Sequence, residues 1–429
     1  MACTDTDGWQ NFSGKRCADY DREWCAYGRF VPGAEWTGGE QFNHPEQHCC
    51  SCGKGGGSGP AAAVGSDKLL LGPSDPRLVA SDFFASQMRD GALAFHRQYD
   101  PAFRCGSGAF MQDLPCMAPG ARVVVETDAD DVVALLRYGG NAGYCAVSCT
   151  GTAPSSCYRP GRGRSRRCNN QCAPSLVVDG EVHALAEAAR GRYTGDEEVA
   201  LLRAAGGGEG GGGGRVRRVE VVMPWGAVVA LRGLRLTRGG GGAVLARAPA
   251  PAPGRTMVFY GDSITQGFCS AATHAFPEEV ARLNFWREAR EGRRWHAVNM
   301  GIAGMRLIAS HGTAVGRVGG DLVVTLIGTN DWWSCQDIGG RTSTLVQNIR
   351  AVQPHTPLAV VTPLPAWYNG QKKCGGGYTL DQMRAQVVGA VLGLQPRDDK
   401  LFLLDGPELL PFALLEDELH PSADGAPHS

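Results

Sequence analysis

The sequence lacks the features that mark several large classes of protein. Its 42 lysines and arginines are balanced by 43 aspartates and glutamates, so we expect neither a basic surface for nucleic acid nor a strongly acidic one. The longest apolar runs, such as Leu322 to Ile327, have the length of a strand, which argues against a membrane span. A neutral ligand or a small molecule is therefore the expected partner, and nothing in the sequence specifies an oligomeric state.

Cysteine, in contrast, is abundant. The chain has 16 cysteines, most of them before residue 173, and this density is typical of disulfide-bonded proteins of an oxidising compartment. We therefore expect a secreted protein, and the sequon Asn11-Phe12-Ser13 agrees with secretion. The first ten residues hold no apolar segment of the signal-peptide type, so this expectation requires that a signal was removed or that the gene start is misassigned.

Composition divides the chain into three expected domains. Residues 1–58 hold six cysteines and end in a glycine-rich stretch, which predicts a small disulfide-rich module before a flexible linker. For the cluster Cys49-Cys50-Ser51-Cys52 zinc binding is the alternative, although the spacing matches no standard ligand pair. In residues 76–250, short apolar runs such as "RRVEVVMPW" and "AVVALRGLRL" predict a β-sandwich of the jelly-roll type.

The third expected domain, residues 255–429, alternates apolar runs with helix-like segments. Runs such as "TMVFYG" and "DLVVTLIG" are followed by segments such as "LDQMRAQVVGAVLGLQ", in which apolar residues recur every three or four positions. This alternation predicts an α/β fold, a doubly wound parallel sheet in three α/β/α layers. Ligands of such sheets bind at the carboxyl ends of the strands, so the residues that follow each apolar run are the candidates for a site.

Ser263 follows the first of these runs, in "FYGDSITQG", as either a helix cap or a nucleophile. A serine hydroxyl becomes a strong nucleophile only beside a base, and the base needs a third group that fixes its tautomer. Asp417 and His420 stand three residues apart in "EDELHPSADG", so both can face the same side of a turn. They are the expected orienter and base, with His428 as the weaker alternative for the base.

Two further strand ends offer donors for an oxyanion. Gly304, in "NMGIAGM", has no side chain that would shield its N–H, and the Asn330 amide lies in "LIGTND". Each has an ordinary structural interpretation as well, since glycines often end strands and asparagines often cap helices.

Four neighbours of these residues also invite a role. We expect Asp262 and Asp331 to be structural acceptors for the N–H groups of the strand-end turns. Trp332 and Trp333 follow Asn330, and either they belong to the core or one of them lines an acyl or sugar site.

The motifs "GDSIT", "GIAG", "GTND" and "DELHP" resemble, in this order, those of the SGNH or GDSL-type hydrolase family over about residues 256–426. The resemblance implies no metal and no organic cofactor. It implies these roles: Ser263 as nucleophile and, through its N–H, oxyanion donor; Gly304 and Asn330 as further donors; His420 as base; Asp417 as its orienter.

Three comparisons with relatives follow from this resemblance. The G-x-S-x-G elbow of the α/β-hydrolases is absent, because Thr265 stands where that motif needs glycine. Family members usually continue into a helix after the histidine block, whereas only "APHS" follows "HPSADG", so we expect a truncated chain or a missing helix. The β-rich segment, in "FHRQYD", "VVDGEV" and "VEVVMPWGAVVALRGLRL", resembles the amino-terminal sandwich of family 2 carbohydrate esterases, and the first module resembles small cysteine-rich modules that end in CC-x-C-G.

The expected function is a serine esterase that hydrolyses a small-molecule or glycan ester through an acyl-enzyme, with acetyl groups on a carbohydrate as the implied substrate. Two alternatives stay open: an extracellular carbohydrate-binding or adhesion protein with an inactive hydrolase domain, and a lipase or thioesterase of the same fold. Cysteine parity suggests that Cys335 pairs with Cys374 and leaves Cys269 unpaired or in a cross-domain bridge.

Overall fold

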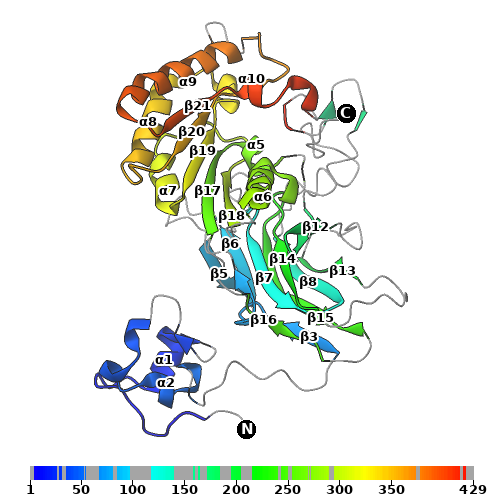
Figure 1. Ribbon diagram of the computed structural model, residues 1–429, viewed down its shortest axis with the longest axis vertical. Coiled ribbons are helices and arrows are strands. Elements are labelled where there is room, and N and C mark those ends of the chain that lie inside the picture. The colour runs from blue at the N-terminus through cyan, green and yellow to red at the C-terminus, as the bar shows by residue number, and fades with distance from the viewer. Residues whose placement is uncertain are drawn as a thin grey trace.

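A computed structural model describes the fold of most of the chain (Figure 1). The described residues are 4–26, 29–30, 35–52, 54, 67–80, 85–96, 117–139, 158–159, 163–164, 172–183, 195–203, 215–239, 243–249, 254–268, 270, 272–288, 294–372, 377–415 and 419–421. Among these residues, no helix is both long and apolar enough to cross a membrane.

The amino-terminal module is built around disulfide bonds. Its elements are α1 (Cys17–Glu23), β1 (Cys25–Ala26), β2 (Arg29–Phe30), η1 (Glu35–Thr37), η2 (Glu40–Phe42), α2 (Pro45–His48) and η3 (Cys50–Cys52). Cys17 bonds to Cys49 and Cys25 to Cys52, and Cys50 is also disulfide-bonded. The disulfide interpretation of the cysteine cluster is therefore confirmed, because the sulfurs that zinc would need are already in disulfides.

The sequon of this module is not an exposed acceptor for a glycan. The Asn11 side chain is buried, and its Nδ2, the atom that would carry a sugar, donates to the Tyr20 hydroxyl at 2.9 Å. Its Oδ1 accepts from the backbone N–H groups of Ser13 and Lys15. The sequon's support for secretion is thus lost, because this asparagine has a structural role in the module.

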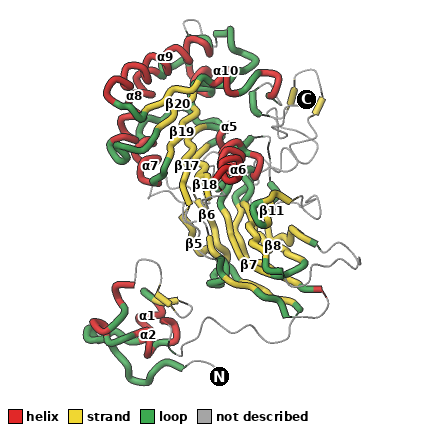
Figure 2. The backbone as a smooth tube through the Cα atoms, viewed as in Figure 1, coloured by secondary structure: helices red, strands yellow, loops and turns green. Residues whose placement is uncertain are grey.

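Two antiparallel sheets form the β-sandwich that the apolar alternation predicts (Figure 2). Their strands are β3 (Lys68–Leu71), β4 (Val79–Ala80), β5 (Ala85–Arg89), β6 (Ala92–His96), β7 (Arg122–Thr127), β8 (Asp131–Tyr138), β11 (Ser175–Val178), β12 (Glu181–His183), β13 (Gly195–Leu202), β14 (Arg217–Val222), β15 (Val229–Thr237) and β16 (Ala246–Arg247). One sheet has the order β12-β11-β14-β7-β16, with β4 on β7, and the other has β13-β8-β15-β6-β5, with β3 on β15. The short strands β9 (Tyr158–Arg159) and β10 (Gly163–Arg164) pair separately. Every second residue of β8 is buried, as expected for a strand with one face on a core.

The rest of the chain forms a parallel sheet with the order β18-β17-β19-β20-β21. Its strands are β17 (Gly254–Gly261), β18 (Arg294–Gly301), β19 (Leu322–Leu326), β20 (Leu358–Val361) and β21 (Leu401–Leu404). The helices are α5 (Ser263–Gln266), η8 (Ala272–His274), α6 (Phe276–Glu288), α7 (His311–Val318), η10 (Asn330–Ser334), α8 (Gly339–Arg350), α9 (Leu380–Leu394), η11 (Gln395–Arg397), α10 (Gly406–Leu409) and η12 (Phe412–Leu414).

Helices cover both faces of this sheet (Figure 1). Val258 and Tyr260 of β17 share a buried cluster with residues of α7, α8 and α9, whereas Met257 and Phe259 of the same strand pack with α6. The predicted three-layer α/β architecture is therefore confirmed. The strand order reverses between β17 and β19, and this switch point is where a doubly wound sheet binds its ligands.

A buried ion network joins the sandwich to the α/β part. Arg122 of β7 donates to Glu220 of β14 at 2.8 Å and also pairs with Glu278 of α6. Both carboxylates are almost fully buried. Burial opposes ionisation, but Arg122 and Arg218 outweigh it at Glu220 and hold the pKa of that carboxyl at about 2. At Glu278 burial dominates and raises the pKa.

The substitution Arg122→Met tests this network. It leaves Glu278 without its cation and Glu220 with Arg218 alone, so we expect the free energy of unfolding at pH 7 to fall by about 3–5 kcal/mol. The matched control is Arg247→Met, which breaks the pair of the largely exposed Arg247 with Glu126 and is expected to cost less than about 1 kcal/mol. Urea unfolding followed by tryptophan fluorescence measures both, and equal losses would contradict the network's importance.

Candidate active site

The site begins at two glycines that let α5 lie directly against the ends of β17 and β18. A Cβ atom on Gly261 would lie 2.1 Å from the Thr265 side chain, and one on Gly301 would lie 2.3 Å from the backbone nitrogen of Gln266. No larger residue fits at either position. Asp262 caps the short helix, because its Oδ1 accepts the Ile264 N–H at 2.9 Å. Ser263, the first residue of α5, thereby stands at the carboxyl end of the sheet.

Ser263 and His420 are 157 residues apart in the sequence but lie in contact in the fold. The Ser263 Oγ and the His420 Nε2 share a hydrogen bond of 2.8 Å, and both side chains are buried. In the neutral tautomer that carries its proton on Nδ1 the hydroxyl is the donor to Nε2, which is the arrangement of a nucleophile and its base. The Phe268 ring lies 4.6 Å from the imidazole, centroid to centroid, and supports it from one side. Asp417, the expected orienter, and His428, the alternative base, lie outside the described residues.

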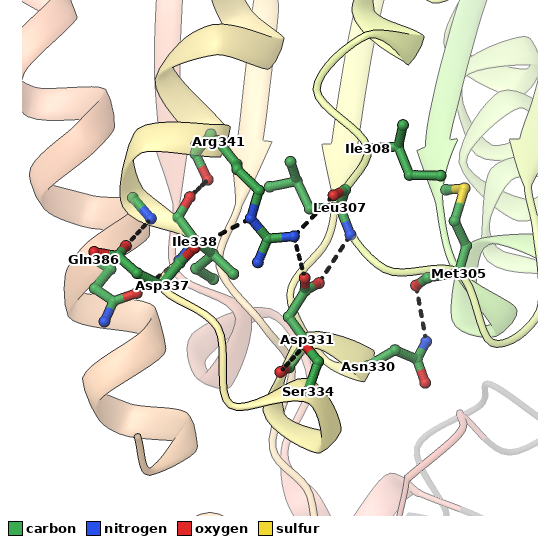
Figure 3. Close-up of polar contacts among 12 residues, drawn as sticks. Met305, Leu307, Ile308, Asn330, Asp331, Ser334, Asp337, Ile338, Arg341 and Gln386 are labelled. Carbon is green, nitrogen blue, oxygen red and sulfur yellow. Dashed lines mark hydrogen bonds and ion pairs between the residues drawn. The ribbon is translucent and has the colours of Figure 1, made fainter. Parts of the chain in front are cut away.

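Gly304 and Asn330 lie on neighbouring loops at the same edge of the sheet. Gly304 is exposed in the loop after β18, and Asn330 begins η10 after β19. The Asn330 Nδ2 donates to the Met305 carbonyl oxygen at 3.1 Å, so the side chain ties one loop to the other (Figure 3). An amide nitrogen carries two hydrogens, and this bond occupies one of them.

Asp331 holds the same two loops from the buried side. Its Oδ2 accepts the Leu307 N–H at 2.9 Å, and its Oδ1 forms an ion pair with Arg341 at 2.9 Å (Figure 3). Arg341 also donates to the Leu307 carbonyl oxygen. The prediction that Asp262 and Asp331 accept backbone N–H groups of the strand-end turns is confirmed, and both are fully buried.

The surroundings of Asp262 disfavour the ionised form of its carboxyl group. Burial raises the pKa of its carboxyl from the ordinary 3.8 to about 6, with the Ile264 N–H and His420 acting against the increase and Asp331 adding to it. Within the described part of the chain, its Oδ2 has no hydrogen-bond partner. The ionised form is therefore costly in the folded protein.

The two tryptophans after Asn330 have different environments. Trp332 is buried, stacks on Tyr368 at 4.0 Å and donates its Nε1–H to the Gln371 carbonyl oxygen, so it belongs to the core. Trp333 is 40% exposed. Sequence reasoning missed Trp367, which is 47% exposed and lies 6.5 Å from Trp333 between ring centroids. The sequence does contain a signal for Trp367, because it lies in "LPAWYN", the segment that follows the next strand of the sheet, β20.

Tyr368, whose ring both exposed indoles contact, lies next to the loop that carries Asn330. The Tyr368 hydroxyl donates to the carbonyl oxygen of Thr329, the residue before Asn330. Burial and the nearby charge of Asp262 raise the pKa of Tyr368. The exposed indoles thus pack against a tyrosine that is bonded to the loop carrying Asn330. In the described residues, no group of three or more His, Cys, Asp or Glu side chains is arranged to hold a metal ion.

Asp262→Asn should change how stability depends on pH. Because folding raises the carboxyl pKa, the folded state binds this proton more tightly than the unfolded one, and stability is lost as the pH rises from about 4 through about 6. The variant has no such loss. Its stability relative to the native protein should rise over this range by about 3 kcal/mol, at about 1.4 kcal/mol per pKa unit, and stay constant above it.

Thermal and urea unfolding between pH 4 and pH 8 measure this difference. The control is Asp337→Asn, which neutralises an exposed aspartate that accepts the Gly339 N–H in the same way. No gain is expected there, because burial does not oppose that charge. A difference between Asp262→Asn and the native protein that does not vary with pH would refute the buried-charge interpretation.

Comparison with known proteins gives one family match and several similar folds. Residues 259–426 match the sequence model of the GDSL-like lipase/acylhydrolase family. No curated protein matches the chain. The chain is similar in structure to the salicylyl-acyltransferase SsfX3 from a tetracycline biosynthetic pathway, with 20% identity over 84% of this chain and 93% of that one and a TM-score of 0.58.

Two other solved structures are similar. A GDSL-like lipase from Bacteroides ovatus has 15% identity over 83% of this chain and 93% of its own, with a TM-score of 0.59. A family two carbohydrate esterase from Cellvibrio japonicus has 15% identity over 79% of this chain and 88% of its own, with a TM-score of 0.45. The acyltransferase and the Bacteroides protein show that the overall fold of this chain recurs in other proteins. The α/β segment, residues 259–426, is thus similar in sequence to the GDSL-like lipase/acylhydrolase family, whose model matches it.

Proposed function

We propose that the protein is a serine esterase that removes short acyl groups, such as acetyl, from a carbohydrate. The observation that carries the proposal is the buried hydrogen bond of 2.8 Å between Ser263 Oγ and His420 Nε2. It lies at the switch point of a parallel sheet, in a segment whose sequence matches a hydrolase family. Disulfide bonds at Cys17–Cys49 and Cys25–Cys52 support a secreted protein, because such bonds persist in oxidising compartments.

The first half of the reaction forms an acyl-enzyme. His420 takes the hydroxyl proton as the Ser263 Oγ attacks the ester carbonyl carbon, and the carbonyl oxygen becomes an oxyanion. The N–H groups of Ser263 and Gly304 and the amide of Asn330 are the proposed donors to that oxygen, and losing one such donor typically costs about 3–4 kcal/mol of transition-state stabilisation. The C–O bond then breaks, and the alcohol leaves with the proton from His420.

The second half regenerates the enzyme. His420 removes a proton from a water molecule, whose oxygen attacks the acyl carbon, and the carboxylic acid departs as Ser263 recovers its proton. Asp417 remains the proposed partner of the other ring nitrogen, which would fix the tautomer that leaves Nε2 facing the serine.

A sugar leaving group is supported by the two exposed indoles beside the site. Trp333 and Trp367 keep 40% and 47% of their surface exposed although each packs against Tyr368. Exposed aromatic faces are available to the apolar C–H faces of a sugar ring, while the indole N–H can bond to a hydroxyl group. This feature favours a glycan ester over a simple small ester.

Ser263→Ala tests the esterase proposal. We expect the native protein to hydrolyse p-nitrophenyl acetate faster than long-chain esters, and we expect the variant to lose at least about a thousandfold in kcat, because the attacking oxygen is gone. An organophosphonate probe followed by mass spectrometry should label Ser263. Preference for long acyl chains would favour a lipase, and folded protein without activity or labelling would favour an inactive hydrolase domain in a binding protein.

Trp333→Ala and Trp367→Ala test the glycan. We expect each to raise the KM for acetylated oligosaccharide about tenfold while the KM for p-nitrophenyl acetate changes less than about twofold, since only the sugar reaches the indoles. The matched control is Phe402→Ala, which truncates an aromatic ring of the same 47% exposure on β21. Equal effects on both substrates would count against sugar binding at these residues.

A further inference from the structure

We infer that the β-sandwich helps to position the active site. Its segment at Trp225 bonds to Gln266, and Gln266 in turn holds the loop that carries the Gly304 N–H. This inference rests on the proposed function, in which that N–H stabilises the oxyanion. Gln266 is the last residue of α5, three residues after Ser263, and is fully buried.

The carboxamide of Gln266 joins two separate segments. Its Oε1 accepts the Ala303 N–H at 2.6 Å, and its Nε2 donates to the Trp225 carbonyl oxygen at 3.0 Å. Ala303 directly precedes Gly304, and Trp225 follows β14 of the sandwich. A buried amide whose two ends are both bonded has one orientation, so the position of the Gly304 loop depends on the sandwich backbone.

Trp225 is itself firmly placed. Its ring is fully buried in the core cluster of the α/β part, and its Nε1 donates to the Ser270 carbonyl oxygen at 2.6 Å. The ring centroid also lies 4.9 Å from Phe268, the residue whose ring supports His420. The same sandwich residue therefore contacts Phe268, whose ring lies against the base, and bonds to Gln266, which holds the loop of Gly304.

The chemical consequence follows from the peptide that links Ala303 to Gly304. The Gly304 N–H belongs to this peptide, and the Gln266 bond holds the peptide directly before it, which carries the Ala303 N–H and shares the Ala303 Cα atom with it. An oxyanion donor is effective only at about 2.7–3.1 Å from the developing charge, and a misplacement of about 1 Å can cost on the order of a hundredfold in rate. Because the charge exists only in the transition state, loss of the Gln266 bonds should lower kcat and leave KM unchanged.

Gln266→Met and Gln266→Glu test this positioning role. The methionine variant loses both bonds, so we expect kcat for p-nitrophenyl acetate to fall about 10- to 100-fold with KM within about twofold of the native value. The carboxyl group that replaces the amide in Gln266→Glu can accept the Ala303 N–H, and in its protonated form it can also donate to Trp225. That variant should therefore keep more activity, and its activity relative to the native protein should fall as the pH rises.

The matched control is Gln386→Met, which removes another glutamine side chain that accepts a backbone N–H, that of Ile338, at 2.9 Å. We expect its kcat to stay within about twofold of the native value even if it unfolds as easily as Gln266→Met. Equal losses of kcat in the two methionine variants, or a loss that appears in KM alone, would overturn the positioning role.

Hydrogen exchange provides a readout that does not need activity. The amides of residues 302–306 should exchange faster in Gln266→Met than in the native protein and in Gln386→Met, since their anchor is lost. Unchanged exchange there would refute the inference whatever the substrate is. Faster exchange in a protein whose native form neither hydrolyses esters nor reacts with the phosphonate would instead support the anchor and refute the proposed function.

Discussion

The close approach of α5 to Gly261 and Gly301 is the constraint on which the rest of the site depends. A helix of four residues is not stable alone, so its contacts with the strand ends must hold it. Asn299 of β18 adds a bond of 2.7 Å from its Nδ2 to the Thr265 carbonyl oxygen. Ser263 can face His420 because this packing fixes where the helix begins, and a Cβ at either glycine would move it.

The sequence predicted the parts of this arrangement that repeat along the chain. Apolar runs followed by helical segments predicted the parallel sheet, and parallel strands end at one edge, so Ser263, Gly304 and Asn330 were expected to gather there. The structure places all three at that edge and brings His420 to the serine. The roles of these residues remain predictions, as do the domain boundaries and the orienting role of Asp417. Cys335 is disulfide-bonded, while Cys374 and Cys269 lie outside the described residues.

The sequence could not show which residues that are far apart in the chain come into contact. Trp332 and Trp333 are neighbours with the same side chain, yet η10 turns one into the core and leaves the other exposed, and no composition rule separates them. Trp367 reaches the same place from another strand end. Gln266 gave no signal either, because the partners of its carboxamide, among them Ala303 and Trp225, come from separate loops that only the fold brings together.

The segment that matches the family model therefore depends on contacts with residues outside it. It covers residues 259–426, but the carbonyl oxygen that anchors Gln266, the ring that supports Phe268 and the cation that neutralises Glu278 all come from residues before it. Removing the sandwich would take away the cation that pairs with Glu278 and the carbonyl oxygen that accepts from Gln266, and with them the bonds that hold these two side chains in place. The proposed hydrolase chemistry thus rests on residues of short motifs, whereas the contacts that we infer to position them are shared with a domain that those motifs do not describe.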